Sequence, residues 1–169
     1  MNSLISVLLL LTVISFSSIA QHDTIPMSSL GGKYCGELNK DGIPHGQGEL
    51  IATFGGGGYV GEWKNGVYHG QGKKTWHTGD VYEGEWKLGK RHGQGKMTWK
   101  NGMTHEGTWK NNNEHGEGVI VYTHGNSRSG KWVHGLMHGK GSYKVQDDGE
   151  SYDDNYYHGY NLRSTDSIR

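Results

Sequence analysis

The side chains best suited to chemistry in this sequence are its histidines, 11 in number. A His-Gly-x-Gly pattern recurs among them at steps of 24, 23, 23 and 23 residues, at His45, His69, His92, His115 and His138. Imidazole is a common zinc ligand, but all ligands of one zinc ion must lie about 2.1 Å from it. If each repeat adds two strands at about 4.8 Å, equivalent histidines stand about 9–10 Å apart. We therefore expect the histidines to pack on or bond their own turns, and we expect no metal site.

A second chemical candidate is the glycine-rich run at 56–61, which satisfies G-x-G-x-x-G. A dinucleotide site would need a strand before this run and a helix after it. The residues that follow show strand periodicity instead. In addition, no nucleophile, base and orienting residue stand out as a set. We therefore expect no bound cofactor and no catalytic residues.

Basic side chains gather in the middle of the chain, where residues 59–110 hold nine Lys or Arg against five Asp or Glu. Lys64, Lys87 and Lys110 recur at the repeat spacing and form a column. Such a column could contact anionic lipid at about 1 kcal/mol per basic residue. Acidic residues on the same face, such as Glu62, favour instead a solvated surface of mixed charge, with cross-strand pairs to lysines such as Lys73. The candidate contacts for lipid or a partner are Lys64, Lys73, Lys87, Lys90, Arg91, Lys96 and Lys110.

The composition limits the kind of fold that could position these residues. The 169 residues include 30 Gly and only 32% hydrophobic residues, too few for the aliphatic core of an ordinary α/β enzyme. Disordered chains combine few aromatics with high net charge. Here the formal net charge is zero, and 6 Trp and 10 Tyr are present. A thin fold faced with aromatic side chains fits this composition, and neutral charge argues against a nucleic-acid partner.

A repeat of about 23 residues organises the aromatic and glycine residues. Tyr82, Gly84 and Trp86 alternate with charged residues, which is the period-2 pattern of a half-buried strand. A turn containing Gly89 then leads to a return strand, so each unit predicts a β-hairpin. A glycine between the two rings lets both lie over the backbone. The structural repeat positions are Tyr59, Gly61, Trp63, Tyr82, Gly84, Trp86, Gly107, Trp109, Gly130 and Trp132.

One hairpin alone is marginal in water, but hairpins stacked side by side bury a continuous aromatic row. The sequence therefore predicts an all-β protein: an elongated single-layer antiparallel sheet of stacked hairpin repeats. The array occupies residues 34–150, after a linker at 21–33. A degenerate repeat or cap and a tail follow at 151–169. The predicted repeats are 34–58, 59–81, 82–104, 105–127 and 128–150.

Residues 1–20 have the pattern of a secretory signal peptide. The stretch from Leu4 to Ile19 carries no charge, and Ser18 and Ala20 supply small residues for cleavage after position 20. The alternative is an uncleaved anchor, although the apolar stretch is shorter than the ~20 residues of a spanning helix. Cys35, the single cysteine, excludes an intrachain disulfide and leaves an intermolecular one open. We expect export, to a secreted, periplasmic or extracytoplasmic membrane location.

The repeat resembles the MORN motif (membrane occupation and recognition nexus), Tyr-x-Gly-x-Trp-x-x-Gly-x-x-x-Gly-x-Gly. Residues 82–95 carry it in full, and the resemblance covers about 34–150. Leu38 replaces Trp in the first repeat, and His105 and Arg128 replace the leading Tyr in the fourth and fifth. The resemblance implies an elongated, twisted single-layer sheet with roles in scaffolding, dimerisation and contact with acidic phospholipids.

We therefore expect a non-catalytic binding or scaffold module that acts outside the cytoplasm through protein–protein interaction. One alternative is peripheral attachment to an anionic phospholipid membrane through the basic column. Another is carbohydrate binding or enzyme activity on the aromatic face. The partner protein is unidentified at this stage, and assembly into a homo-oligomer stays open.

Overall fold

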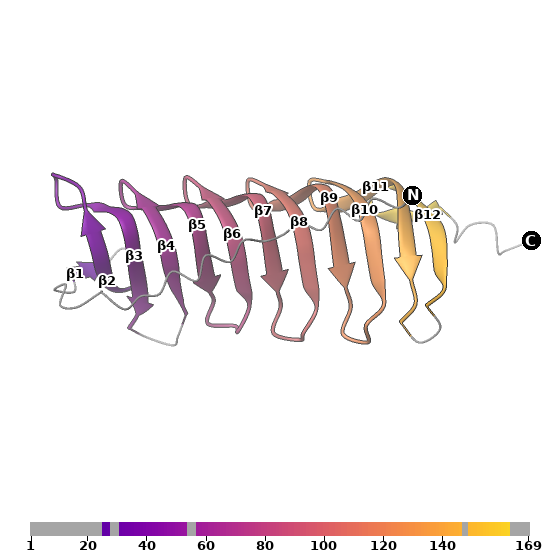
Figure 1. Cartoon of the computed structure of the whole chain (residues 1–169), viewed down its shortest axis with the longest axis horizontal. Helices are drawn as coiled ribbons and strands as arrows, with labels where there is room; N and C mark the ends of the chain where they lie inside the picture. The colour runs from indigo at the N-terminus through magenta and orange to yellow at the C-terminus, as the bar shows by residue number, and fades with distance from the viewer. Residues whose placement is uncertain (1–24, 28–30, 54–56, 147–148, 163–169) are drawn as a thin grey trace, which may run out of the picture.

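A computed structural model describes residues 25–27, 31–53, 57–146 and 149–162. These residues form one antiparallel sheet of 13 strands, whose order in space follows the order in the chain (Figure 1). The predicted all-β sheet of stacked hairpins is confirmed. The strands are β1 (Ile25–Met27), β2 (Gly32–Leu38), β3 (Pro44–Ala52), β4 (Gly58–Lys64), β5 (Val67–Thr75), β6 (Val81–Lys87), β7 (Lys90–Thr98), β8 (Thr104–Lys110), β9 (Asn113–Val121), β10 (Ser127–Val133), β11 (Leu136–Lys144), β12 (Ser151–Tyr157) and β13 (Tyr160–Asn161).

Two kinds of turn join the strands. Within a repeat the turn has two residues, such as Asn65-Gly66 with φ of 49° and 82°. Both φ values are positive, as a type I′ turn requires. Between repeats the loop is longer: the backbone N–H of Trp76 donates to the carbonyl of Asp80 at 2.9 Å. The tight turns lie along the upper edge of the sheet in Figure 1, and the inter-repeat loops lie along the lower edge.

Each hairpin has an irregularity at the same place. Gly84 pairs with Gly95, but the next pair is Trp86 with Arg91, so the return strand contains extra residues. A Cβ at Gly95 would lie 2.2 Å from the Tyr82 hydroxyl oxygen, so this glycine makes room for the ring. A Cβ at Gly84 would first meet the Gly95 Cα at 2.4 Å. The close approach at Gly84 is therefore mainly between two backbones, whereas the glycine that makes room for the ring lies on the facing strand.

The core is a double row of rings on one side of the sheet. Tyr34, Tyr59, Tyr82 and His105 form one row, with exposed fractions of 0–1%. Trp63, Trp86, Trp109 and Trp132 form the other, with exposed fractions of 1–9%. Each indole N–H donates to a glycine carbonyl of the preceding repeat, as Trp86 does to Gly72 at 3.1 Å. Neighbouring rings meet edge to face, which is a geometry that aromatic pairs prefer.

Two further expectations fall near the ends of the chain. The predicted signal peptide at 1–20 lies outside the described residues. Within the part of the chain that the structure describes, no helix is long and apolar enough to cross a membrane. At the other end, β12 pairs with β11 and continues the sheet beyond the fifth repeat. There Asp154 accepts a hydrogen bond from the Tyr156 hydroxyl at 2.6 Å.

Candidate functional site

The charged face is the side of the sheet opposite the aromatic rows. Its central row alternates in sign, because Lys73, Glu83, Lys96 and Glu106 face one another on consecutive strands. Lys73 Nζ lies 3.7 Å from Glu83 Oε2, and Lys96 Nζ lies 3.6 Å from Glu106 Oε2. Exposed pairs of this kind contribute only about 0–1 kcal/mol to folding. The four side chains are 45–56% exposed and stay accessible to a partner.

Glu62 and Glu85 bond the backbone and do not pair with the lysines of the central row, although their place on the charged face suggested such pairs. The carboxylate of Glu85 accepts a hydrogen bond from the backbone N–H of Gln94 at 2.7 Å, and Glu62 does the same for Gln71 at 2.7 Å. Both bonds lie at the irregularity in the hairpin, where the strand pairing leaves this N–H exposed. These two acids therefore hold the bend, and the lysines of the central row pair with Glu83 and Glu106 instead.

The column of lysines lies at the edge of the sheet that carries the tight turns. Lys64 and Lys87 end strands β4 and β6, and Lys87 faces Lys90 across the turn. Leu88 lies between them with 69% of its surface exposed and φ of 51°. We call this region the tip edge, and it comprises Lys64, Lys87, Leu88, Lys90 and Lys110. Among the described residues, no carboxylate forms an ion pair with these lysines.

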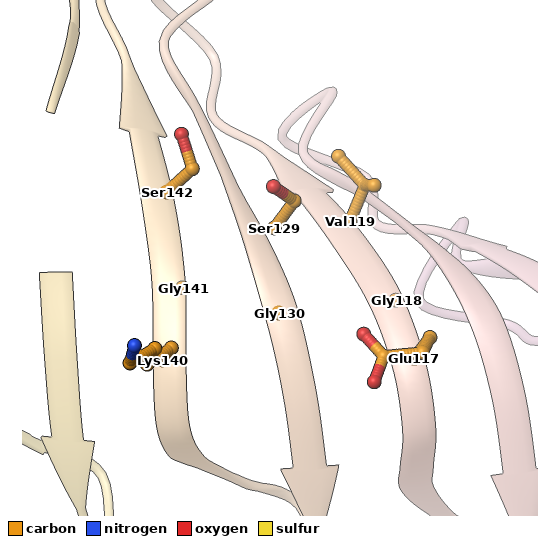
Figure 2. Close-up of a pocket in the computed structure, with 8 residues that line it drawn as sticks. All are labelled: Glu117, Gly118, Val119, Ser129, Gly130, Lys140, Gly141 and Ser142. Carbon is orange, nitrogen blue, oxygen red and sulfur yellow. The ribbon is translucent and has the colours of Figure 1, made fainter. Parts of the chain in front are cut away.

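A shallow hollow interrupts the charged face over β9, β10 and β11 (Figure 2). Val119, Ser129 and Ser142 continue the central row beyond Glu106, and glycine backbone forms the floor between the strands. The small side chains leave the backbone open to solvent. A water-excluding pocket with converging polar groups is what an active site needs, and this open hollow does not supply one. The hollow is therefore an open part of the charged face.

A second hollow lies on the aromatic side, over the second and third repeats, and we call it the aromatic-side hollow. Its lining includes Tyr68, Lys74, Trp76, Trp86, Arg91 and Asn112. The structure thus places Arg91 apart from the lysines with which the sequence grouped it. The signal was present in the sequence, because Arg91 lies an even number of residues before Met97 on the same strand. The grouping by charge alone missed this alternation.

Burial lowers the pKa of two basic groups on the aromatic side. The Arg91 guanidinium lies 4.5 Å from the centroid of the Trp109 ring, and burial lowers the pKa of Arg91. His105 packs edge to face between Trp109 and Trp132. Its ring nitrogens have no hydrogen-bond partner among the described residues, and burial lowers the pKa of His105 to about 4. His105 therefore stays neutral at neutral pH.

The repeated histidines do not converge. His92 Nδ1 accepts a hydrogen bond from the Gly93 backbone N–H at 2.9 Å, so this ring bonds its own turn. The backbone carbonyls of His69 and His92 accept hydrogen bonds from Tyr59 and Tyr82 at 3.2 and 3.3 Å. In the described ranges, no group of three or more His, Cys, Asp or Glu side chains could hold a metal ion.

Comparison with known proteins gives one family. The family profile for the MORN repeat matches residues 34–52, 59–81, 82–104, 105–127 and 129–147, which together make up more than half of the chain. No curated protein matches the sequence significantly.

Proposed function

The chain belongs to the MORN-repeat family, and we propose that it is a non-catalytic module that binds a protein partner on its charged face. Repeats of this family often mediate protein or membrane interactions. The proposal for this chain depends on one observation, which is the alternation of Lys73, Glu83, Lys96 and Glu106 along the central row.

The alternating row favours a protein over a membrane as the ligand of this face. An anionic lipid surface would attract Lys73 and Lys96 but repel Glu83 and Glu106, which lie between and beside them. A protein surface can present the complementary order of charges, and complementary charges increase specificity and the rate of association. The exposed row also suits a large contact area better than it suits a small ligand.

Site-specific cross-linking tests where the partner binds. A photoreactive amino acid at position 119 would replace Val119, which is 40% exposed on the charged face. The matched control places the same group at Asn112, an exposed residue of the aromatic-side hollow. We expect adducts with the native partner from position 119 and not from position 112. Adducts from position 112 alone would place the partner on the other face and would refute the proposal.

We propose further that the module acts after export. The uncharged stretch before Ala20 and the small residues at its end support this, since both are features of a cleavable signal peptide. The mature chain should then begin at Gln21, and amino-terminal sequencing of the exported protein tests this. A product that keeps residues 1–20 would contradict the proposal.

The tip edge favours a second candidate function, which is attachment to anionic membranes. Leu88 is 69% exposed and stands between Lys87 and Lys90, so apolar and basic side chains project together. This combination matches the interface of a bilayer with anionic headgroups. Co-sedimentation with phosphatidylserine vesicles and with phosphatidylcholine vesicles tests it. Binding that needs phosphatidylserine and is lost in the triple variant Lys64→Glu, Lys87→Glu, Lys110→Glu would support the candidate, and equal recovery with both lipids would exclude it.

A further inference from the structure

The aromatic-side hollow combines flat apolar rings with basic side chains. Trp86 lies at its base with an exposed fraction of 5%, whereas Tyr68 and Trp76 at its wall are half-buried. Tyr68 stacks on Tyr59 with ring centroids 3.9 Å apart, so its position is fixed. Lys74 and Arg91 complete the wall, and the lining contains no carboxylate.

Both cations in this hollow keep unused hydrogen-bond donors. Lys74 Nζ donates to the Tyr68 hydroxyl at 3.0 Å, which uses one of its three donors. Arg91 donates to the Asn112 carbonyl at 2.7 Å and to the Met97 sulfur at 3.6 Å, although a guanidinium has five donors. Glu114 on the next repeat favours the charged form of Arg91 but forms no ion pair with it among the described residues. A carboxylate from a ligand would therefore find free donors on both residues.

The hollow is particular to one place in the array. One repeat later, Met97 takes the position of Lys74, and Glu114 takes the position of Arg91. An extended acidic chain that followed the aromatic side would meet Glu114 and be repelled. The hollow therefore suits a compact ligand with one negative group, and its volume is about 350 Å³.

We propose that the aromatic-side hollow binds a single uronate sugar, a pyranose that carries one carboxylate. The apolar C–H face of the pyranose ring packs on the rings of Tyr68 or Trp76. The carboxylate accepts hydrogen bonds from Lys74 and Arg91, and the exposed amide of Asn112 bonds a hydroxyl of the sugar. This site is separate from the charged face, so it can be occupied whether or not a protein partner is bound there.

Titration of the full chain with a uronate monosaccharide tests the proposal by calorimetry. The chain offers matched controls, because Lys73 and Lys90 precede Lys74 and Arg91 in sequence but lie on the opposite face. A charge-assisted hydrogen bond is worth about 1.5–3 kcal/mol, so Lys74→Gln and Arg91→Gln should each weaken binding about tenfold or more. Lys73→Gln and Lys90→Gln should leave the affinity within about twofold, since exposed charges on the far face are screened.

The other arms of the experiment distinguish the ligand class. A neutral hexose should bind about tenfold more weakly than the uronate, because it lacks the carboxylate. In NMR spectra the indole N–H signals of Trp76 and Trp86 should shift with the uronate, while that of Trp132 should not. The proposal is overturned if the neutral sugar binds as tightly, if triglutamate binds as tightly, or if Lys73→Gln weakens binding as much as Lys74→Gln. Absence of any binding by the uronate would overturn it as well.

Discussion

Replacement of Trp86 by alanine should destabilise the array more than most single changes in the chain. The ring is 5% exposed and meets Tyr82 edge to face at 5.1 Å and Tyr59 at 5.6 Å. Burial of about 200 Å² of aromatic surface at about 25 cal/mol/Å² gives about 5 kcal/mol. The lost N–H bond to the Gly72 carbonyl adds about 1 kcal/mol, and partial collapse of the cavity offsets some of this total. We expect a loss of about 3–5 kcal/mol.

Urea denaturation followed by far-UV circular dichroism measures this loss. Glu83→Ala is the matched control, because Glu83 lies on the same strand and pairs with Lys73 on the exposed face. Its removal should change the free energy of unfolding by about 0.5 kcal/mol or less. Equal effects of the two substitutions would refute the assignment of the faces. A loss below about 1 kcal/mol for Trp86→Ala would refute the view that the rings link neighbouring repeats.

Three further predictions concern single positions. Burial holds the pKa of His105 at about 4, below its ordinary 6.5, so the neutral form is native. The contribution of His105 to the free energy of unfolding is therefore complete above pH 6.5 and falls by about 3 kcal/mol as the pH drops from 6.5 to 4. His105→Phe should remove this loss of stability, which denaturation melts across the same pH range measure. Gly95→Ala places a Cβ 2.2 Å from the Tyr82 hydroxyl and should lower the free energy of unfolding by about 1–3 kcal/mol. An unchanged near-UV spectrum and melting temperature would contradict this packing of Tyr82 against Gly95. Leu88→Asn should stabilise the chain by about 0.5–1 kcal/mol, because asparagine tolerates the φ of 51°, and it should weaken any binding to phosphatidylserine vesicles in the co-sedimentation assay.

The fold could be predicted because the repeat fixes both the strands and their buried side. Tyr82 and Trp86 have the same parity, and Tyr59 and Trp63 occupy the same positions in the preceding repeat, which requires hairpins of one length stacked in one order. The hydrogen bond that the Gln94 N–H donates to Glu85 could not be predicted, because it depends on extra residues in the return strand. Periodicity alone does not reveal such an irregularity.

The candidate sites were less predictable than the fold. The sequence groups Arg91 with the lysines by charge, although alternation along β7 puts it on the side of Met97. It shows that histidine replaces tyrosine at position 105, but it does not show that the ring nitrogens lack a partner. That property depends on the width of the space between Trp109 and Trp132, which only the three-dimensional packing determines.

A charge-swapped variant tests most directly whether a protein partner binds the charged face. The four substitutions Lys73→Glu, Glu83→Lys, Lys96→Glu and Glu106→Lys preserve both ion pairs and the net charge, but they reverse the order of charges that a partner meets. Affinity capture from native material should then lose the partner that the unmodified chain retains, at an unchanged melting temperature. Retention of the same partner by both proteins would contradict the proposed role of the charged face.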